Sequence, residues 1–325
     1  AATCLGTSDA VLSRRAFDVC IIDEASQITV PTCLGPLRLA DRFVMIGDHH
    51  QLTPLVRDKD AAQHGMNVSL FQRLCKAHPS SVAMLCTQYR MNAEIMALSN
   101  ALVYDGRLEC GNDSVARAAL TVARDACPPW LSDVLDPVRP AVFVNTDAMN
   151  AIESRADTLV ENRAEAAWIV SMSEALIQAN VASTDIGILT PYRQQAKLLR
   201  DHCACEVLTV DQAQGRDWPV VIVSLVRSNK THTVGELLRD ERRVNVMITR
   251  AKTKLVLVGS HSTMTHGPCS EPMPALVPLL RVIQATKPPD IPIHVSPGQQ
   301  RYVKKVRRHT PVLTDLLNEQ DWISE

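Results

Sequence analysis

Short apolar runs alternate with helix-like patterns along this chain, and that alternation restricts the possible fold more than any other feature. Longer stretches with apolar residues at helical spacing, such as 91–103, 160–179 and 192–202, separate the runs. Strands that alternate with helices form parallel sheets, because each helix returns the chain to the same edge. The sequence therefore predicts an α/β fold with mainly parallel strands. The expected strands are 18–23, 42–47, 81–86, 141–145, 185–190, 206–210, 219–226 and 254–260.

Length and charge limit the possible classes of protein. The 325 residues are 46% hydrophobic, enough for two domains with separate cores. The net charge is −1, so bulk electrostatics does not predict nucleic-acid binding, and such binding would need local basic patches. One basic stretch, 301–309, is equally well interpreted as a solvated tail. No run of about 18 apolar residues is present, so no membrane contact is predicted.

The ten cysteines are scattered, and several sit inside apolar runs, where a reduced thiol packs as a small hydrophobic group. Only Cys203 and Cys205 are close in sequence, and no second pair stands at the spacing of a metal site. We predict reduced cysteines in an intracellular protein and no metal site built from them.

Polar residues follow two of the predicted strands. Asp23 ends one predicted strand and Glu24 follows it, and the segment 47–51, GDHHQ, begins at the end of the next strand. Ligands of open α/β sheets bind at the carboxyl edge, so two such strand ends favour one shared site. The alternative is that each strand simply reaches the surface in an ordinary turn.

Three further segments are candidates for phosphate contacts. Arg90 stands between a predicted strand and a helix, and arginine is well suited to phosphate because it donates parallel hydrogen bonds. The competing interpretation, favoured if this residue is taken alone, is a surface arginine near the start of a helix. Gln214 and Gly215 occupy a turn before a long buried strand. The stretch 242–252 has the pattern of a helix that carries Arg250, for which a structural ion pair is the competing interpretation.

The order of these motifs resembles that of the superfamily 1 helicases of the Upf/Dna class. The matching segments are IIDEASQ, GDHHQLTP, QYRMN, LTPYRQQ, TVDQAQGRD and RRVNVMITRAK, which together span roughly residues 1–260. A finer resemblance, to the eukaryotic helicase/nucleases of DNA replication, rests on stretches such as LSNALVYDGRLECG and VRSNKTHTVGELLRDERRVNV. It implies a P-loop NTPase-like fold with RecA-like domains.

The resemblance assigns catalytic roles for ATP hydrolysis. It implies that Asp23 holds Mg²⁺, that Glu24 is the general base for the attacking water, and that Gln51 senses the γ-phosphate. Arg90 and Arg250 are implied to be arginine fingers from the second RecA-like domain. Such fingers contribute about 10³–10⁵ in rate by stabilising transition-state charge.

The resemblance also implies binding contacts. Tyr89 is expected near the adenine, Gly215 near the γ-phosphate and Arg216 near the ribose of ATP. Single-stranded DNA is expected to cross both domains, with its phosphates held by backbone amides, hydroxyl groups and an occasional arginine. Threonine at a strand end is more often a cap or turn residue, which is the competing interpretation. The candidate DNA contacts are Thr3, Thr190, Tyr192 and Thr209.

Several positions depart from the expected pattern. The replacements are His50, Thr53, Gln212, Ala213 and Met247, and none of them removes a charged catalytic group. The larger departure is that no G-x-x-x-x-G-K-[ST] loop occurs, and no Gly-Lys dipeptide at all. Because that loop anchors the phosphates of ATP, we expect this chain by itself neither to hydrolyse ATP nor to cut DNA.

The expected organisation is that of the carboxyl-terminal part of a helicase. We predict the end of a first RecA-like domain at 1–86, a complete second one at 87–262 and an extension at 263–325. An iron–sulfur cluster is expected only in the nuclease part, outside this chain. By resemblance the substrate is single-stranded or flap DNA, the partners are replication and repair proteins, and the compartments are the nucleus and, second, mitochondria. An RNA helicase of the same class and a truncated, inactive nucleic-acid-binding protein are the alternatives.

Overall fold

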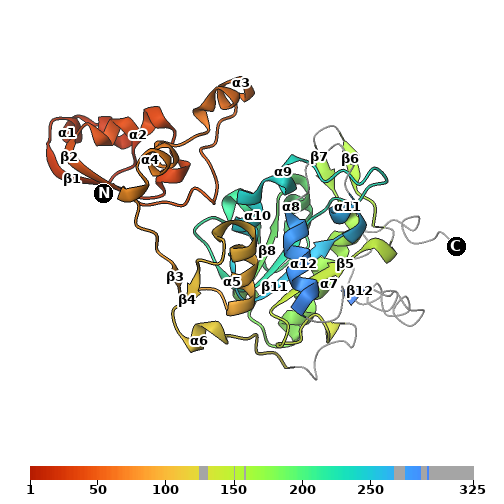
Figure 1. Ribbon diagram of the computed structural model, residues 1–325. Helices are drawn as coiled ribbons and strands as arrows, with labels where there is room; N and C mark the ends of the chain where they lie inside the picture. The colour runs from red at the N-terminus through yellow and green to blue at the C-terminus, as the bar shows by residue number, and fades with distance from the viewer. Residues whose placement is uncertain (124–130, 150, 157–158, 267–274, 287–290, 293–325) are drawn as a thin grey trace. The chain divides into compact units, whose positions relative to one another are not determined.

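The structure is a computed structural model that describes residues 1–123, 131–149, 151–156, 159–266, 275–286 and 291–292 (Figure 1). The chain divides into two compact units, unit 1 over residues 1–85 and unit 2 over residues 86–325. The expected extension 263–325 lies largely outside the described residues, as does the basic stretch 301–309.

Unit 1 is built on two parallel strands, β1 (Phe17–Ile22) and β2 (Ala40–Met45). Helix α2 (Val30–Leu37) connects them, and their register pairs Ile22 with Met45, so both strands end at one edge. The other elements of unit 1 are η1 (Leu5–Ser8), α1 (Ala10–Ser13), η2 (Ala25–Gln27), α3 (Lys59–Ala61), η3 (Ala62–Met66), α4 (Leu70–Ala77) and η4 (Pro79–Ser81).

The faces of this strand pair are largely open. Ile21 is 67% exposed, and Phe43 and Val44 are each half exposed. Parallel strands are normally covered on both faces, so the exposure of these apolar side chains is unusual for their strand type. The small core of the unit lies at the strand ends, where Ile22, Ala25 and Cys33 are buried together.

Unit 2 contains a six-stranded sheet in which every pair is parallel, in the order β12-β5-β11-β10-β8-β9. Val, Ile and Leu fill its central strands, as expected for a sheet buried on both faces. The strands are β5 (Ala141–Asn145), β8 (Ile186–Thr190), β9 (Glu206–Thr209), β10 (Trp218–Ser224), β11 (Ala251–Gly259) and β12 (Ile291–Pro292).

Helices cover both faces of this sheet. Helix α7 (Arg163–Gln178) and helix α8 (Arg193–Arg200) share the main core with alternate residues of the strands. Helices α5 (Ala93–Ser99) and α12 (Leu276–Thr286) pack on β11 and β5 from the other side (Figure 1). The remaining elements are β3 (Thr87–Gln88), η5 (Asn100–Tyr104), β4 (Glu109–Cys110), α6 (Asp113–Ala116), η8 (Asp147–Met149), β6 (Ser154–Ala156), β7 (Leu159–Glu161), η9 (Ser183–Asp185), η10 (Val210–Gln212), α9 (Glu236–Arg239), α10 (Glu241–Ile248) and α11 (His261–Thr265).

The predicted α/β fold with mainly parallel strands is confirmed, and three local expectations are wrong. No strand forms at 81–86, where Leu85 is 86% exposed at the junction of the two units. The predicted helix over 242–252 ends at Ile248, and β11 already begins at Ala251. The stretch 127–140 has the proline-rich composition that predicts a linker or surface excursion, but Leu131, Val134 and Leu135 pack into the main core.

The structure also bears on the expectations of no membrane-spanning segment and of reduced cysteines. None of the helices described is both long and apolar enough to cross a membrane. Cys203 and Cys205 are free thiols, and burial raises their pKa to about 12 and about 11, so both stay protonated at neutral pH.

Candidate functional site

The carboxyl edge of unit 1 brings two predicted segments together. The backbone N–H of Ala25 donates to the carbonyl of Ile46, 2.8 Å away, so the turn after β1 lies against the turn after β2. Gly47 permits this approach, since a Cβ there would stand 2.9 Å from the nitrogen of Ser26. The polar residues after the two strands therefore occupy one edge of the sheet.

Asp23 and Glu24 are both exposed at this edge. Asp23 accepts a hydrogen bond from the Glu24 backbone N–H at 2.9 Å, and Glu24 accepts one from the Gln27 amide at 2.8 Å. Glu24 has φ 51°, a left-handed conformation that is uncommon for a residue other than glycine. The two adjacent carboxylates thus accept from different donors, one from the backbone and one from a side chain.

Asp48 organises the second turn. Its carboxylate accepts hydrogen bonds from the His50 backbone N–H at 2.9 Å and from the Gln51 amide at 3.0 Å. The second bond fixes the side chain of Gln51 close to the strand ends. The rings of His49 and His50 lie 4.2 Å apart beside it.

In unit 2, Gln88 shapes the turn that carries Tyr89 and Arg90. Its side-chain oxygen accepts from the backbone N–H groups of Arg90 and Met91, each at 2.8 Å, and its amide nitrogen donates to the Met91 carbonyl. Tyr89 is 67% exposed, and its ring lies so close to Gly111 that a Cβ there would clash with it. The turn thus presents an aromatic ring and a guanidinium from a fixed backbone.

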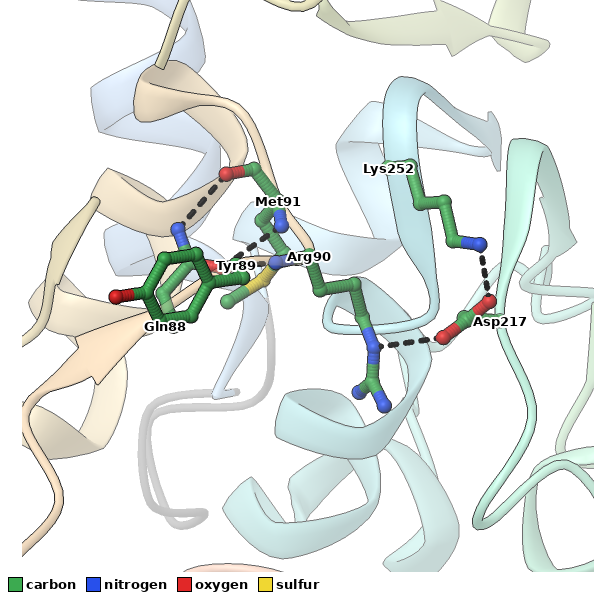
Figure 2. A pocket seen from close by; sticks show the side chains of 6 residues that line it. All are labelled: Gln88, Tyr89, Arg90, Met91, Asp217 and Lys252. Carbon is green, nitrogen blue, oxygen red and sulfur yellow. Dashed lines mark hydrogen bonds and ion pairs between the residues drawn. The ribbon is translucent and has the colours of Figure 1, made fainter. Parts of the chain in front are cut away.

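Arg90 lines a cavity of about 440 Å³ together with a carboxylate and a second cation (Figure 2). The Nε of Arg90 donates to Asp217 at 3.0 Å, and the Nζ of Lys252 lies 2.6 Å from the other oxygen of the same carboxylate. Partial burial disfavours the charged carboxylate, but the Lys252 hydrogen bond and the Arg90 charge outweigh it and lower the pKa of Asp217. Two cations and one anion leave an excess positive charge at the cavity, which suits an anionic ligand.

Arg250 lies between α10 and β11 and is only 2% exposed. Its guanidinium donates to the carbonyls of Val246 and Arg216, each at 3.1 Å, and to the Thr249 hydroxyl at 2.8 Å. These bonds hold the buried guanidinium in place, and a phosphate contact by Arg250 stays a prediction.

The predicted ribose and γ-phosphate contacts lie on one turn. Gly215 has φ +79°, which favours glycine, and nothing lies within 4 Å of a Cβ built there. The Arg216 guanidinium is exposed and forms an ion pair with Glu206. The turn is therefore open on its Gly215 side.

The four predicted DNA contacts are divided between the two units. Thr3 is exposed in unit 1 and accepts from the Gly6 backbone N–H at 3.1 Å. The other three belong to unit 2 and are buried, with Thr190 at 0% exposure. The Thr190 hydroxyl accepts from the Tyr192 backbone N–H at 3.3 Å, and the Tyr192 hydroxyl lies 3.5 Å from the Val234 carbonyl. Thr209 forms a capping box with Gln212, so these hydroxyls serve local structure, and DNA contact by them stays a prediction.

The sequence reasoning missed a buried polar network at the end of β10. Glu165 on α7 is completely buried and accepts hydrogen bonds from the Ser224 hydroxyl at 2.5 Å and from the Val226 backbone N–H at 2.9 Å. Val226 has φ 69°, a strained conformation for a β-branched residue. Beside it, Arg227 forms a buried ion pair with Glu153 at 2.8 Å. The sequence offered little signal, because the same helical pattern also contains Glu161 and Glu174.

It also missed Asp217 and Lys252. Each stands two residues after a residue that was singled out, Asp217 after Gly215 and Lys252 after Arg250. Only the spatial neighbourhood shows that both face Arg90.

The described residues offer few protein ligands for Mg²⁺, and an ion that is bound together with a nucleotide needs few. The described residues contain no group of three or more His, Cys, Asp or Glu side chains that could hold a metal. Mg²⁺ usually takes one or two carboxylates, with water and substrate phosphates as the other ligands. The exposed carboxylate of Asp23 at a strand end fits that lesser requirement.

The parallel sheets with polar residues at their carboxyl ends place this chain in the P-loop NTPase-like class of α/β proteins. Residues 66–262 match a family model described as an AAA domain, and residues 1–59 match a second model of the same description. The chain belongs to the AAA domain family.

Relatives in animals and plants match along both units. "DNA replication ATP-dependent helicase/nuclease DNA2" of Mus musculus is 47% identical over 287 residues, 82% of this chain and 27% of that protein. The Homo sapiens protein of that name is 48% identical over 277 residues, 80% of this chain and 26% of that protein. "DNA replication ATP-dependent helicase/nuclease JHS1" of Arabidopsis thaliana is 47% identical over 274 residues, 82% of this chain and 21% of that protein. The chain thus spans about a quarter of the length of these relatives. The solved structure of the PRRSV helicase covers 74% of this chain and 34% of its own at 16% identity, with a TM-score of 0.38.

Proposed function

We propose that this chain is motor machinery of an ATP-dependent DNA helicase/nuclease that acts in DNA replication and repair. The observation that carries the proposal is the identity of 47–48% over four-fifths of the chain to mouse and human proteins of that name. The two AAA family models span the strand ends of unit 1 and the residues that line the cavity of unit 2. ATP use by the complete protein and the roles assigned below are part of this proposal.

In unit 1, we assign Asp23 to the Mg²⁺ that accompanies the nucleotide and Glu24 to the attacking water. Their placement at one strand end, with Gln51 fixed by Asp48 on the neighbouring turn, supports this division of roles. When bound, Mg²⁺ would neutralise charge on the phosphates. Glu24 would accept the proton of the water, and Gln51 would respond to the γ-phosphate.

In unit 2, we assign Arg90 and Arg250 to the charge that develops on the transferred phosphoryl group. The cavity beside Arg90, with its excess positive charge, supports the first assignment. Tyr89 offers an exposed ring for the adenine, and Gly215 and Arg216 form an open turn for the γ-phosphate and ribose. Electrostatic stabilisation by such groups is usually the largest contribution to phosphoryl transfer.

We further propose single-stranded or flap DNA as substrate, contacts to it from Thr3, Thr190, Tyr192 and Thr209, and replication and repair proteins as partners. The nucleus follows from a role in replication, and mitochondria are the second proposed compartment. An iron–sulfur cluster would belong to a nuclease part outside these residues.

The test is Glu24→Gln in the full-length protein, compared with Asp18→Asn, which removes an exposed carboxylate from β1, the strand that precedes Glu24. General-base catalysis contributes about 10²–10⁴ in rate, so turnover of ATP should fall by that factor while ATP still binds. Asp18→Asn should leave turnover unchanged. Near-normal hydrolysis by Glu24→Gln would refute the assignment of the general base.

The nucleic-acid preference is tested with the same enzyme. Stimulation of its ATPase by single-stranded DNA and not by RNA of the same sequence is expected. Equal or stronger stimulation by RNA would favour an RNA helicase of the same class.

A further inference from the structure

Asp217 stands between the two cations of the unit 2 cavity. It contacts Arg90 through one carboxylate oxygen and Lys252 through the other, at 3.0 Å and 2.6 Å. All three side chains are partly exposed, at 36% for Arg90, 30% for Asp217 and 42% for Lys252. The carboxylate is therefore close enough to solvent to meet a ligand, and near enough to both cations to set their positions.

The contact uses only one side of the Arg90 guanidinium. Asp217 accepts from Nε, and the Thr249 carbonyl lies 3.4 Å from Nη1. No acceptor in the described part of the chain takes a hydrogen bond from Nη2, and Figure 2 shows both terminal nitrogens pointing away from Asp217. The side of the guanidinium that can bind a phosphate oxygen thus stays available while the Nε side is held.

Asp217 itself is on a firmly held segment. The Arg216 backbone N–H donates to the Ala213 carbonyl at 3.1 Å, and the Trp218 N–H donates to the Arg250 carbonyl at 3.0 Å, where β10 begins. The Arg216 carbonyl in turn accepts from the buried Arg250 guanidinium. A carboxylate fixed by backbone bonds on both sides can hold a long, flexible arginine in one orientation.

We propose that Asp217 is a positioning residue: it holds Arg90 by Nε, so that the terminal nitrogens face the cavity, and it places Lys252 as a second cation there. The proposal rests on the proposed function, in which Arg90 stabilises charge on the phosphoryl group. It adds two residues, Asp217 and Lys252, to the groups that set the geometry of this reaction.

An opposite role for the same contact makes a different prediction. If Asp217 occupied the place of a phosphate and held Arg90 out of use, its removal would raise the rate. If Asp217 bound the nucleotide directly, its removal would raise KM for ATP and leave kcat nearly unchanged. The positioning role predicts a loss in kcat instead.

The experiment measures DNA-stimulated ATPase of the full-length protein in Asp217→Asn, Arg90→Ala and the double variant. Asp211→Asn is the matched control, because Asp211 also accepts from an arginine Nε, that of Arg243 at 3.3 Å, on the connection before β10. A misplaced catalytic group costs up to about 100-fold in rate, so Asp217→Asn should lower kcat about 10- to 100-fold. Its KM for ATP should change less than about 3-fold, because ground-state binding is kept.

The double variant separates the outcomes. Arg90→Ala should lose about 10³ or more in kcat, and adding Asp217→Asn should then lower kcat by clearly less than it does in the parent protein, since the part of its role that acts through Arg90 is already gone. An unchanged or raised kcat in Asp217→Asn, or an undiminished effect in the Arg90→Ala background, would overturn the proposal while the finger role of Arg90 stands. Full activity of Arg90→Ala would overturn both.

Arg90→Lys provides a second test of the same contact, which remains informative if the Asp217→Asn variant does not fold. It keeps the positive charge and removes the Nε donor, so its kcat should fall nearly as far as that of Arg90→Ala. Near-normal kcat in Arg90→Lys would also refute the positioning role.

Discussion

The buried carboxyl group of Glu165 should make unit 2 less stable as the pH rises. Burial raises its pKa from an ordinary value of 4.5 to about 8, and the hydrogen bonds from Ser224 and Val226 only partly oppose this. In the native state the group therefore keeps a proton that the unfolded chain releases. Glu165→Gln provides the comparison, because its amide stays neutral at every pH.

The size of the effect follows from proton linkage. Between pH 4.5 and pH 8 the native state binds up to one more proton than the unfolded state, so the free energy of unfolding falls as the pH rises. The slope is about 1.4 kcal/mol per pH unit, or about 5 kcal/mol over the whole interval. Relative to Glu165→Gln, the parent protein should lose about 4 kcal/mol between pH 5 and pH 8.

Urea unfolding followed by tryptophan fluorescence measures this difference. All four tryptophans fall within residues 86–325, so the signal reports on the unit that contains Glu165. Glu236→Gln is the control, since it removes an exposed carboxylate from the same unit and should leave the pH dependence of the parent unchanged. A free-energy difference between parent and Glu165→Gln that stays flat from pH 5 to pH 8 would show that Glu165 is ionised in the native state.

Two further stability predictions use the same assay. Arg227→Ala leaves Glu153 as a buried charge without its ion-pair partner, which should lower the free energy of unfolding by about 3–5 kcal/mol, and a loss below about 1 kcal/mol would contradict the importance of this pair. Gly187→Ala places a Cβ 2.4 Å from the buried Trp218 ring, so overpacking should cost about 1–3 kcal/mol and shift the native fluorescence spectrum; an unchanged spectrum and midpoint would refute it.

The sequence predicted the sheet of unit 2 well because its strands are continuous apolar runs. Such runs are typical of parallel strands buried on both faces, and β5 at Ala141–Asn145 falls where the run predicts it. The same reasoning failed at 81–86, where an apolar run of strand length finds no neighbouring strand and stays irregular. Composition indicates that a segment can form a strand, and only pairing decides whether it does.

Local sequence patterns likewise predicted only part of the candidate site. Local patterns alone predicted that polar residues follow β1 and β2, because a parallel pair ends at one edge, and the register of Ile22 with Met45 places them there. The roles of Arg90 and Arg250 came from resemblance, and the structure gives the two arginines different surroundings, one beside a cavity and one buried among carbonyls.

Sequence by itself therefore determined the α/β class, most strands and the positions of the polar strand ends, since these depend on patterns within a few residues. Tertiary structure alone decided that Asp217, 127 positions from Arg90 along the chain, is its partner, and that Glu165 lies buried against the end of β10. Those contacts join distant segments, and no local periodicity encodes which distant side chain a charged group will meet.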